Sequence, residues 1–442
     1  MRILQLALAV LAAFAFFNTA RAESSLRRDF PPGLQVPAQA QPGPGFDAEK
    51  ATTAWLDLLS PEQRRLSDEY FEGGYWLHLW ETVYDIGVMA VLLTTGLSRQ
   101  MRDFAERVSR RPVLNVPIYV ALFVVATFVL GLPMRIYVDF VREHQYGLSN
   151  LTFVHWLGEA LIGLAISVVI GGLALTALYA AVRRAGARWW VWATGITFVF
   201  FLFLTFVTPL LIAPLFNDYK PLPEGPAREG IIALAHANGI PADHLAWFDA
   251  SKQTTRISAN VSGLWGMARI SLNDNLLNNT SLPEIKAVMG HEMGHYVLNH
   301  AMKLAVYLSL LFGLAFFMLN FAFDRLLAAW GPRFGLRGRA DPAALPLALA
   351  VFSVIWLLLM PLRNTVVRDV EIEADAFGVN AAREPQGFAM AAMRLSTYRK
   401  IKPGPIEEFI FYDHPSGYDR VHRAMVWQKE NLPAAPGGEA AR

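Results

Sequence analysis

The sequence predicts a mainly α-helical fold: a polytopic bundle of membrane helices that carries a small α+β domain. Three observations support this class. The chain of 442 residues is 54% hydrophobic and only 17% charged, which is more apolar than an ordinary soluble protein. Its apolar residues are gathered into runs long enough to cross a bilayer, so the lipid bilayer is an expected partner. One polar stretch, residues 216–301, interrupts these runs with shorter helical and strand-like patterns.

Charge and cysteine content exclude several classes of function. The net charge of +2 is close to balanced and gives no electrostatic basis for binding nucleic acid. The chain has no cysteine, which excludes disulfides, cysteine-zinc sites and thiol catalysis. Any metal ion must therefore be held by His, Asp or Glu side chains.

The amino terminus resembles a targeting segment. Arg2 precedes the apolar run "ILQLALAVLAAFAFF", and Ala20-Arg21-Ala22 forms a small-x-small cleavage pattern. We expect residues 1–22 to be a signal peptide or, if uncleaved, a first membrane segment, and both place residue 23 outside the cytoplasm. Residues 23–74 are expected to form an extension with a flexible linker, "FPPGLQVPAQAQPGPGF", followed by one or two exposed helices.

Six further membrane spans are predicted, each near or above the roughly 20 residues that a crossing needs. They divide the chain into membrane helices one to four within 75–215, a polar domain at 216–301, helices five and six within 302–363, and a carboxyl-terminal segment at 364–442. The spans themselves lie at 75–97, 113–134, 153–182, 189–215, 302–324 and 343–362.

Loop arginines orient these spans. Three loops are rich in arginine: Arg99, Arg102, Arg107, Arg110 and Arg111; Arg183, Arg184 and Arg188; and Arg325, Arg333, Arg337 and Arg339. The short loop on the opposite side carries only Arg135 and Arg142. The positive-inside rule therefore places the three basic loops in the cytoplasm. Residues 216–301 and all residues after 363 then face outward, which agrees with the targeting segment.

The polar domain is predicted to combine helices with a small sheet. Helical spacing extends over "EGPAREGIIALAHANGI", and three short alternating stretches, "HLAWFDA", "RISANVSG" and "ARISLND", are expected to be strands. Ser281-Leu-Pro-Glu284 matches a capping box, which marks the start of a helix. We expect that helix to carry His291 and His295 and to run on into the fifth span.

The stretch "HEMGHYVLNH", residues 291–300, predicts a zinc site. His291 and His295 are four residues apart, so on a helix both imidazoles can reach one metal ion. Glu292 lies beside them on the next face, where its carboxylate can accept a proton from water without binding the metal. Two imidazoles, an open position and an adjacent carboxylate are the requirements of a hydrolytic zinc site.

Spacing alone leaves the third ligand open. A metzincin would continue to a third histidine, but position 298 is Leu and the next histidine is His300, so that pattern does not fit. A gluzincin takes a glutamate from a second helix instead. In "VVRDVEIEADAFG" both Asp369/Glu373 and Glu371/Asp375 are four residues apart, and the predicted topology returns either pair to His291.

Five ordered motifs resemble the integral-membrane zinc metallopeptidases of the type-I CAAX prenyl endopeptidase family, which are related to the heat-shock membrane protease of bacteria. The resemblance extends from about residue 130 to residue 425. It rests on "APLFNDYKPLPEG", the "SAN" at 258–260, "EIKAVMGHEMGH", "EIEADAFG" and "DHPSGYDR". It implies a gluzincin-type zinc metalloprotease domain with Glu371 as the third zinc ligand and Asp375 bracing a ligand histidine.

The same resemblance implies roles for three more residues and matches a fourth. Asn260 would lie on a strand that pairs with extended peptide substrate. His414, and with it Arg420, would steady the oxyanion of the transition state. The family's Ser-Arg pair ahead of the glutamate is Val367-Arg368 here, so Arg368 matches and the serine does not.

The function expected from residues and resemblance together is zinc-dependent peptide hydrolysis of polypeptide substrates. One Zn²⁺ per chain would be the cofactor, with His291, His295 and Glu371 as ligands and Glu292 as the base. The outward site predicts a protease of envelope proteins in a bacterial inner membrane, acting on the periplasmic or outer side, where prenylated CAAX substrates are not expected. The alternatives are a non-cleaving chaperone or scaffold, or a transport protein, that retains the zinc fold. The sequence gives no oligomeric state.

Overall fold

The computed structural model describes residues 30–263 and 268–432, so the predicted targeting segment at residues 1–22 lies outside the described residues. The chain divides into two compact units. Among the described residues, unit 1 contains Trp76–Leu204 and Ala305–Met360. Unit 2 contains residues 30–75, 205–304 and 361–432, apart from the gap at 264–267.

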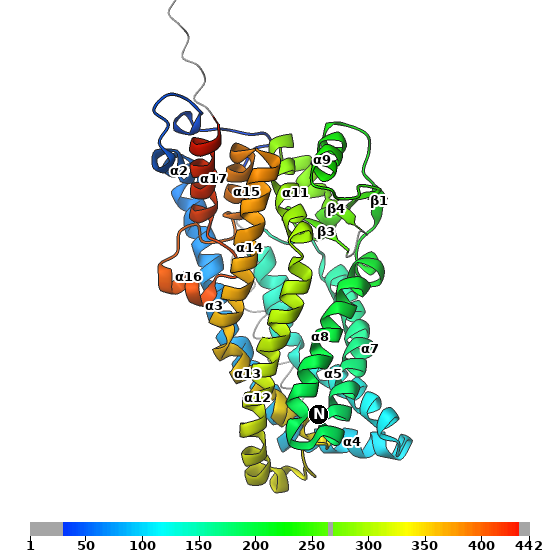
Figure 1. Cartoon of the computed structure of the whole chain (residues 1–442). Helices are drawn as coiled ribbons and strands as arrows, with labels where there is room; N and C mark the ends of the chain where they lie inside the picture. The colour runs from blue at the N-terminus through cyan, green and yellow to red at the C-terminus, as the bar shows by residue number, and fades with distance from the viewer. Residues whose placement is uncertain (1–29, 264–267, 433–442) are drawn as a thin grey trace, which may run out of the picture. The chain divides into compact units, whose positions relative to one another are not determined.

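Unit 1 is built from long apolar helices (Figure 1). Its helices, some of which continue into residues of unit 2, are α3 (Pro61–Thr94), α4 (Leu97–Val108), α5 (Pro112–Arg135), α6 (Glu143–Gln145), α7 (Phe153–Ala185), α8 (Trp189–Val207), α12 (His300–Phe334) and α13 (Leu345–Leu358). Two π-helical segments, Ile136–Arg142 and Thr208–Ile212, extend α5 and α8.

Four helical runs in the described residues are long and apolar enough to cross a membrane, or five if the bent pair Pro342–Leu358 and Met360–Ala382 is one span. The run Phe153–Leu215 contains two of the six predicted spans. It is broken at Gly186, whose φ of 53° and ψ of −123° lie outside the helical region. Five of the predicted spans lie on these four runs, although α3 begins before residue 75 and α12 extends ten residues beyond 324. The sixth, 343–362, falls on the bent pair, which is broken at Leu359.

The surface of unit 1 is suited to lipid. Large apolar side chains are exposed along its helices; they include Val125, Val129, Leu161, Val169, Leu173, Val199, Phe203, Leu310 and Leu314. In water such a surface would be costly, whereas in a bilayer it is solvated by acyl chains. The chain is thus a multi-pass integral membrane protein.

Two of the predicted cytoplasmic loops contact each other inside unit 1. Arg102, which lies in α4, forms a buried ion pair with Asp341 at 2.7 Å. Arg337 pairs with Glu106 at 2.7 Å. These pairs place the 99–111 and 325–341 segments at one end of unit 1, as a shared membrane face requires.

Unit 2 is a mixed α+β unit, as predicted. Its helices are α2 (Ala48–Leu56), α9 (Pro226–Ala237), α10 (Asp274–Asn279), α11 (Leu282–Val297), α14 (Met360–Ala382), α15 (Pro385–Leu395), α16 (Pro405–Phe411) and α17 (Gly417–Asn431). Its strands are β1 (Tyr219–Pro221), β2 (His244–Phe248), β3 (Ala259–Ser262) and β4 (Arg269–Asn273). The three predicted strands are β2, β3 and β4, and the predicted helix at 224–240 is α9.

The four strands form one sheet in the order β1-β2-β4-β3. β2 and β4 pair in parallel, whereas β1 and β3 pair antiparallel with their neighbours. Ile270 and Leu272 of β4 are fully buried against Ile231 of α9 and Met289 of α11. Because β3 pairs only with β4, it is an edge strand of this sheet.

Helix α11 lies between the sheet and the carboxyl-terminal helices of unit 2 (Figure 1). It packs on α9 and β3 on one side and on α15 on the other. The predicted capping box is confirmed, because Glu284 accepts from the Ser281 backbone N–H at 2.8 Å. Glu284 also forms a buried ion pair with Arg394 of α15.

The prediction that α11 continues unbroken into the fifth span is wrong. α11 ends at Val297 and α12 begins at His300, with Asn299 between them at φ 58°. This left-handed conformation cannot continue a right-handed helix, and asparagine is one of the few residues that adopt it readily. The break therefore gives α12 its own direction.

The segment predicted to be a flexible linker is packed instead. Residues 30–46 contain little regular structure, as expected, but Phe30 and Ala40 belong to a core shared with α15 and α17. Arg394 donates to the carbonyls of Phe30 and Pro31, and Gln428 donates to that of Ala40. Proline and glycine prevent a helix here, but side-chain hydrogen bonds from neighbouring helices satisfy the backbone.

Candidate metal centre and active site

Helices α11 and α14 touch through their backbones at the candidate site. A Cβ atom added at Gly378 of α14 would lie 2.7 Å from the backbone nitrogen of His291. Added at Gly290 of α11, it would lie 2.9 Å from the carbonyl oxygen of Gly378, and at Gly294 it would lie 3.2 Å from Cα of Ala374. Small residues at four-residue spacing on both helices therefore allow an approach that larger side chains would block.

This contact brings the expected ligands together. His291 and His295 from α11 and Glu371 from α14 each offer a ligand atom, and these atoms all lie within 4.8 Å of one another. The two Nε2 atoms are 3.1 Å apart, and each lies 3.3 or 3.4 Å from an oxygen of Glu371. Of the two alternatives left open by spacing, the Glu371/Asp375 pair is buried and Asp369 is exposed.

The spacing of these atoms fits a small tetrahedral cation. Ligand atoms held about 2.0–2.1 Å from a zinc ion in tetrahedral geometry lie about 3.3 Å from one another. The two Nε2 atoms, 3.1 Å apart, are close to that value, and each also lies near one Glu371 oxygen: Oε2 is 3.3 Å from His291, and Oε1 is 3.4 Å from His295. Two imidazole nitrogens and one carboxylate are also a donor set typical of catalytic zinc, so the residues present fit the ion.

Asp375 and Arg420 brace the ligand group. Asp375 lies 2.8 Å from Nδ1 of His291, which holds the ring proton on Nδ1 and leaves the Nε2 lone pair for a metal. Arg420, at the start of α17, contacts two carboxylates: Nε lies 2.9 Å from Asp375 and Nη2 lies 3.1 Å from Glu371. Its guanidinium thus joins the third ligand to the residue that orients the first.

His414 also reaches the ligand group. Its Nε2 atom lies 3.4 Å from an oxygen of Glu371, and its Nδ1 lies 2.8 Å from Asp413. The loop that carries His414 is held by Arg368 of α14, which donates to the backbone carbonyls of Glu408 and Tyr412. The family resemblance had matched Arg368 without implying a role for it. No role had been predicted for Asp413.

Electrostatics favour a cation at this position. Burial lowers the pKa of His291, but the carboxylates of Asp375 and Glu371 outweigh it and raise that pKa to about 10. Burial and the neighbouring His291 lower the pKa of His295 to about 4. Without an ion, His291 is therefore protonated and His295 is neutral, so the two histidines together carry one positive charge. A metal cation can replace this charge.

Glu292 lies beside the ligands in a different environment. It lines the same cleft as His291 and has no hydrogen-bond partner among the described residues. Burial, followed by repulsion from Glu371, raises the pKa of its carboxyl to about 7. A carboxyl group with a pKa near neutrality and an open side facing a cleft is suited to exchange protons with a substrate or water.

A cleft of about 340 Å³ opens above these residues. One wall is the start of β3, with Ile257, Ser258 and Ala259, and the other is formed by α15 and the residues after it. Asn273 donates its N–H to the carbonyl of Ser258 at 2.9 Å, and the two residues are directly opposite in the antiparallel register. Because bonded and non-bonded pairs alternate, the N–H and C=O of Ala259 point away from the sheet.

The structure places Asn260 on the edge strand, as predicted, but its neighbour Ala259 lines the cleft. The backbone of Asn260 faces β4, and its side chain is exposed. The periodicity of the sequence could not reveal this difference, because which of two successive residues faces outward depends on the pairing register.

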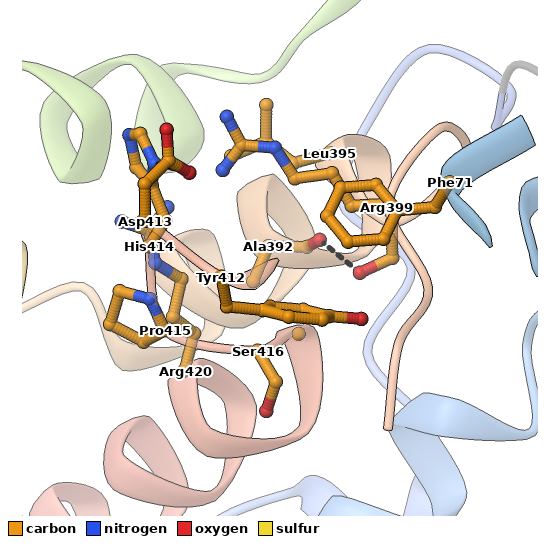
Figure 2. A pocket seen from close by; sticks show the side chains of 12 residues that line it. Phe71, Ala392, Leu395, Arg399, Tyr412, Asp413, His414, Pro415, Ser416 and Arg420 are labelled. Atoms are coloured by element: carbon orange, nitrogen blue, oxygen red, sulfur yellow. Dashed lines mark hydrogen bonds and ion pairs between the residues drawn. The ribbon is translucent and has the colours of Figure 1, made fainter. Parts of the chain in front are cut away.

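A second, small cavity lies behind His414 (Figure 2). It is lined by Phe71, Tyr412 and Ser416 in addition to His414 and Arg420. In Figure 2 the Arg399 side chain extends toward Asp413 and His414, and Arg399 also lines the main cleft. Neither Arg399 nor this cavity was predicted from the sequence.

Comparison with known families gives two matches that together span most of the chain. Residues 49–218 match the amino-terminal domain of CAAX prenyl proteases, which has five membrane helices. Residues 221–428 match peptidase family M48.

Individual proteins are similar over comparable lengths. An uncharacterized metalloprotease, YhfN, of Bacillus subtilis is 31% identical over 88% of this chain and 91% of its own length. The CAAX prenyl protease 1 homolog of rice, Oryza sativa, is 28% identical over 70% of this chain and 73% of its own length. The crystal structure of S. mikatae Ste24p has the same fold, with a TM-score of 0.68 at 22% identity over 84% of this chain and 90% of that one.

These matches agree with the site geometry and with the membrane helices of unit 1. The proteolytic family supplies the expectation of a bound metal and of polypeptide substrates, and the His-His-Glu group is in place for the metal. The chain belongs to peptidase family M48 and is a membrane-embedded metalloprotease.

Proposed function

We propose that this metalloprotease binds one zinc ion through His291, His295 and Glu371 and hydrolyses unprenylated polypeptides on the outer side of a bacterial cell membrane. The proposal depends most on one observation, the convergence of His291, His295 and Glu371, whose ligand atoms all lie within 4.8 Å of one another. In this proposal residues 216–301 and 364–442 together form the catalytic part, and the helices within 75–215 and 302–363 anchor it.

A bound zinc ion would supply a Lewis acid for the scissile carbonyl and would make a water molecule more acidic. Glu292 would accept the proton of that water and pass it to the leaving amine. Its pKa of about 7 supports both steps, because a group with that pKa gains and loses a proton readily near neutral pH.

His414 would stabilise the oxyanion that forms as water attacks. Its Nε2 faces the ligand group, and Asp413 fixes the ring from the other side. A donor aimed at charge that develops only in the transition state accelerates the reaction rather than tightening ground-state binding. Arg420 was expected to share this task, but its guanidinium is paired with Asp375 and Glu371. We therefore propose that Arg420 acts mainly by holding these two carboxylates.

The substrate would bind as an extended strand along β3. The outward N–H and C=O of Ala259 could form main-chain hydrogen bonds with it, as in β-augmentation. The exposed side chain of Asn260 would lie beside this added strand and contact it through its amide. Such binding recognises the main chain of the substrate, which suits a protease that acts on varied polypeptides.

The outward orientation is supported by the distribution of arginines. The basic segments at 99–111 and 325–341 meet at one end of unit 1, and α12 begins at His300 and ends near Arg333. If the basic end is cytoplasmic, residue 300 at the other end of α12 is outside. We do not expect prenylated CAAX substrates on that side, so we propose envelope polypeptides as substrates.

The test is zinc content and peptide hydrolysis of the full-length protein purified in detergent. Wild type is expected to hold about one zinc per chain and to cleave an unfolded, unprenylated polypeptide. Glu292→Gln should keep the zinc and lose activity by about 10²- to 10⁴-fold, because the general base is removed while the ligands remain. A farnesylated CAAX peptide serves as the competing substrate.

Three results would contradict parts of the proposal. Wild-type activity in Glu292→Gln would exclude the proposed base. Preference for the farnesylated peptide would exclude the proposed substrate class. A reporter enzyme fused after Arg442 that proved to be in the cytoplasm would exclude the outward orientation.

A further inference from the structure

The break between α11 and α12 has a direct effect on the metal site. Asn299, at φ 58°, ends one helix direction, and His300 is the first residue of the next helix. His300 is 1% exposed, so its imidazole is buried although it follows a turn. On a continuous helix, the five residues from His295 to His300 would turn the chain by one full turn and about 140°. The two side chains would then not face each other. The break instead turns His300 back toward His295.

The ring of His300 lies between a ligand histidine and a carboxylate. Its Nδ1 is 2.9 Å from Nδ1 of His295, and its Nε2 is 3.0 Å from Glu373 of α14. The carboxylate of Glu373 is held in turn by Lys303, one turn further along α12, at 2.5 Å. None of these three residues was assigned a role by sequence reasoning, and Glu373 had been considered only as a ligand alternative.

These contacts determine where the ring protons lie. The Glu373 carboxylate can only accept, so His300 must donate to it through Nε2–H. A neutral His300 then has a lone pair on Nδ1, which can only accept. His295 must therefore donate through its own Nδ1–H, and this leaves the Nε2 lone pair of His295 directed at the metal position.

We propose that His300 and Glu373 form a positioning relay for His295, in which one carboxylate fixes two successive imidazole tautomers. This inference rests on the proposed function, because it takes His295 as a zinc ligand. The two ligand histidines then differ in how their rings are oriented. His291 receives its orientation directly from Asp375, whereas His295 receives it through His300. Residues that orient ligand imidazoles typically change metal affinity by 10- to 100-fold when they are removed.

The experiment compares zinc affinity in full-length variants by competition with a chelator of known affinity. His300→Leu fills the buried space but has no acceptor, and it should bind zinc about 10- to 100-fold more weakly than wild type. His300→Asn offers an amide oxygen close to the position of Nδ1, and it should stay within about threefold of wild type. Thermal unfolding of the metal-free proteins reports whether either variant is merely less stable.

Glu373 provides an independent test because its side chain is 49% exposed and its removal should not disturb folding. Glu373→Ala should weaken zinc binding by about tenfold, because His300 loses the group that fixes its tautomer. Asp369→Ala is the matched control: Asp369 is an exposed carboxylate on the same helix, one turn away, and the variant should bind zinc like wild type.

The outcomes separate the relay from the proposed function. Wild type that binds no zinc would overturn both. Wild type that binds zinc while His300→Leu and Glu373→Ala bind it equally well would overturn the relay alone. Equal weakening by His300→Leu and His300→Asn, with equal loss of metal-free stability, would assign His300 a packing role and would also overturn the relay.

Discussion

Glycines at the metal site of unit 2 differ from those on the lipid-facing helices of unit 1. In unit 2, Gly290, Gly294 and Gly378 permit a backbone contact between α11 and α14, and a Cβ at Gly378 would meet the backbone of His291 at 2.7 Å. In unit 1, a Cβ added at Gly131 of α5 or Gly163 of α7 would meet nothing within 4 Å in the described part of the chain. A close approach also occurs in unit 1, where a Cβ added at Gly313 of α12 would meet the Thr194 side chain of α8 at 2.5 Å, but this neighbour is a side chain and not the backbone.

This difference teaches how the motifs should be read. In "HEMGH" and "EIEADAFG" the histidines and acidic residues carry the chemistry, but the glycines determine the distance between the helices that carry them. Gly131 and Gly163 of unit 1 lie in helices that present apolar surface to lipid, and these two glycines are not constrained by a neighbour.

The largest effect is expected from Gly378→Ala. Its methyl group would push α14 away from α11, and Glu371 would move with it away from His291 and His295. A displacement near 1 Å at a catalytic centre can reduce the rate by about 100-fold, so we expect at least that loss, together with weaker zinc binding. Zinc content and peptide hydrolysis of the purified variant measure both effects.

Gly163→Ala in α7 is the matched control for this substitution. The same methyl group would enter open space, and alanine is the better helix former, so zinc content and activity should stay within about twofold of wild type. If Gly378→Ala and Gly163→Ala behaved alike, the backbone contact at the site would not be what sets the ligand distances.

The same comparison explains how much of the fold and of the metal site could be predicted from the sequence. The ligands His291 and His295 could be found because four-residue spacing on a helix is local information. Glu371 required a family resemblance, since two pairs in "VVRDVEIEADAFG" had the same spacing. The apolar runs of the membrane helices were also recognisable, because lipid imposes a strong and simple requirement on composition.

What the sequence did not predict depends on tertiary contacts. The break at Asn299 could not be seen because asparagine occurs in many helices, and only the packing of His300 requires a positive φ here. The packing of residues 30–46 was missed because a proline- and glycine-rich composition is shared by free linkers and by irregular chain fixed on a surface. The contacts of Arg420 with two carboxylates likewise depend on where α17 begins.

A smaller but still large effect is expected from breaking a buried ion pair away from the ligands, and each unit offers an example. Arg394→Met in unit 2 leaves Glu284, which is fully buried, without its cation. Arg102→Met in unit 1 does the same to Asp341. Removing one partner of a buried pair typically costs about 3–5 kcal/mol, because the remaining charge is uncompensated. Denaturant titration of each purified variant measures the change in unfolding free energy.

The two substitutions should differ in their effect on the metal. Glu284 belongs to the capping box of α11, so Arg394→Met should also weaken zinc binding, whereas Arg102→Met should leave the zinc affinity of the folded protein unchanged. Adding Glu284→Gln to Arg394→Met removes the uncompensated charge and should restore part of the stability. Equal loss of zinc in the two single variants would show that the site does not depend on α11 in the way we describe.

The smallest effect is expected from Ser281→Ala at the start of α11. The Ser281 hydroxyl lies 2.6 Å from Glu284 in the capping box, and loss of an N-cap side chain typically costs about 1 kcal/mol. Glu284 remains paired with Arg394, and His291 lies ten residues further on, about 15 Å along the helix. Fraying of the first turn should therefore lower the unfolding free energy without changing zinc affinity or kcat/KM at temperatures well below unfolding. A drop in kcat/KM at full zinc occupancy would mean that the position of the ligands depends on the helix terminus as well as on the glycine contact with α14.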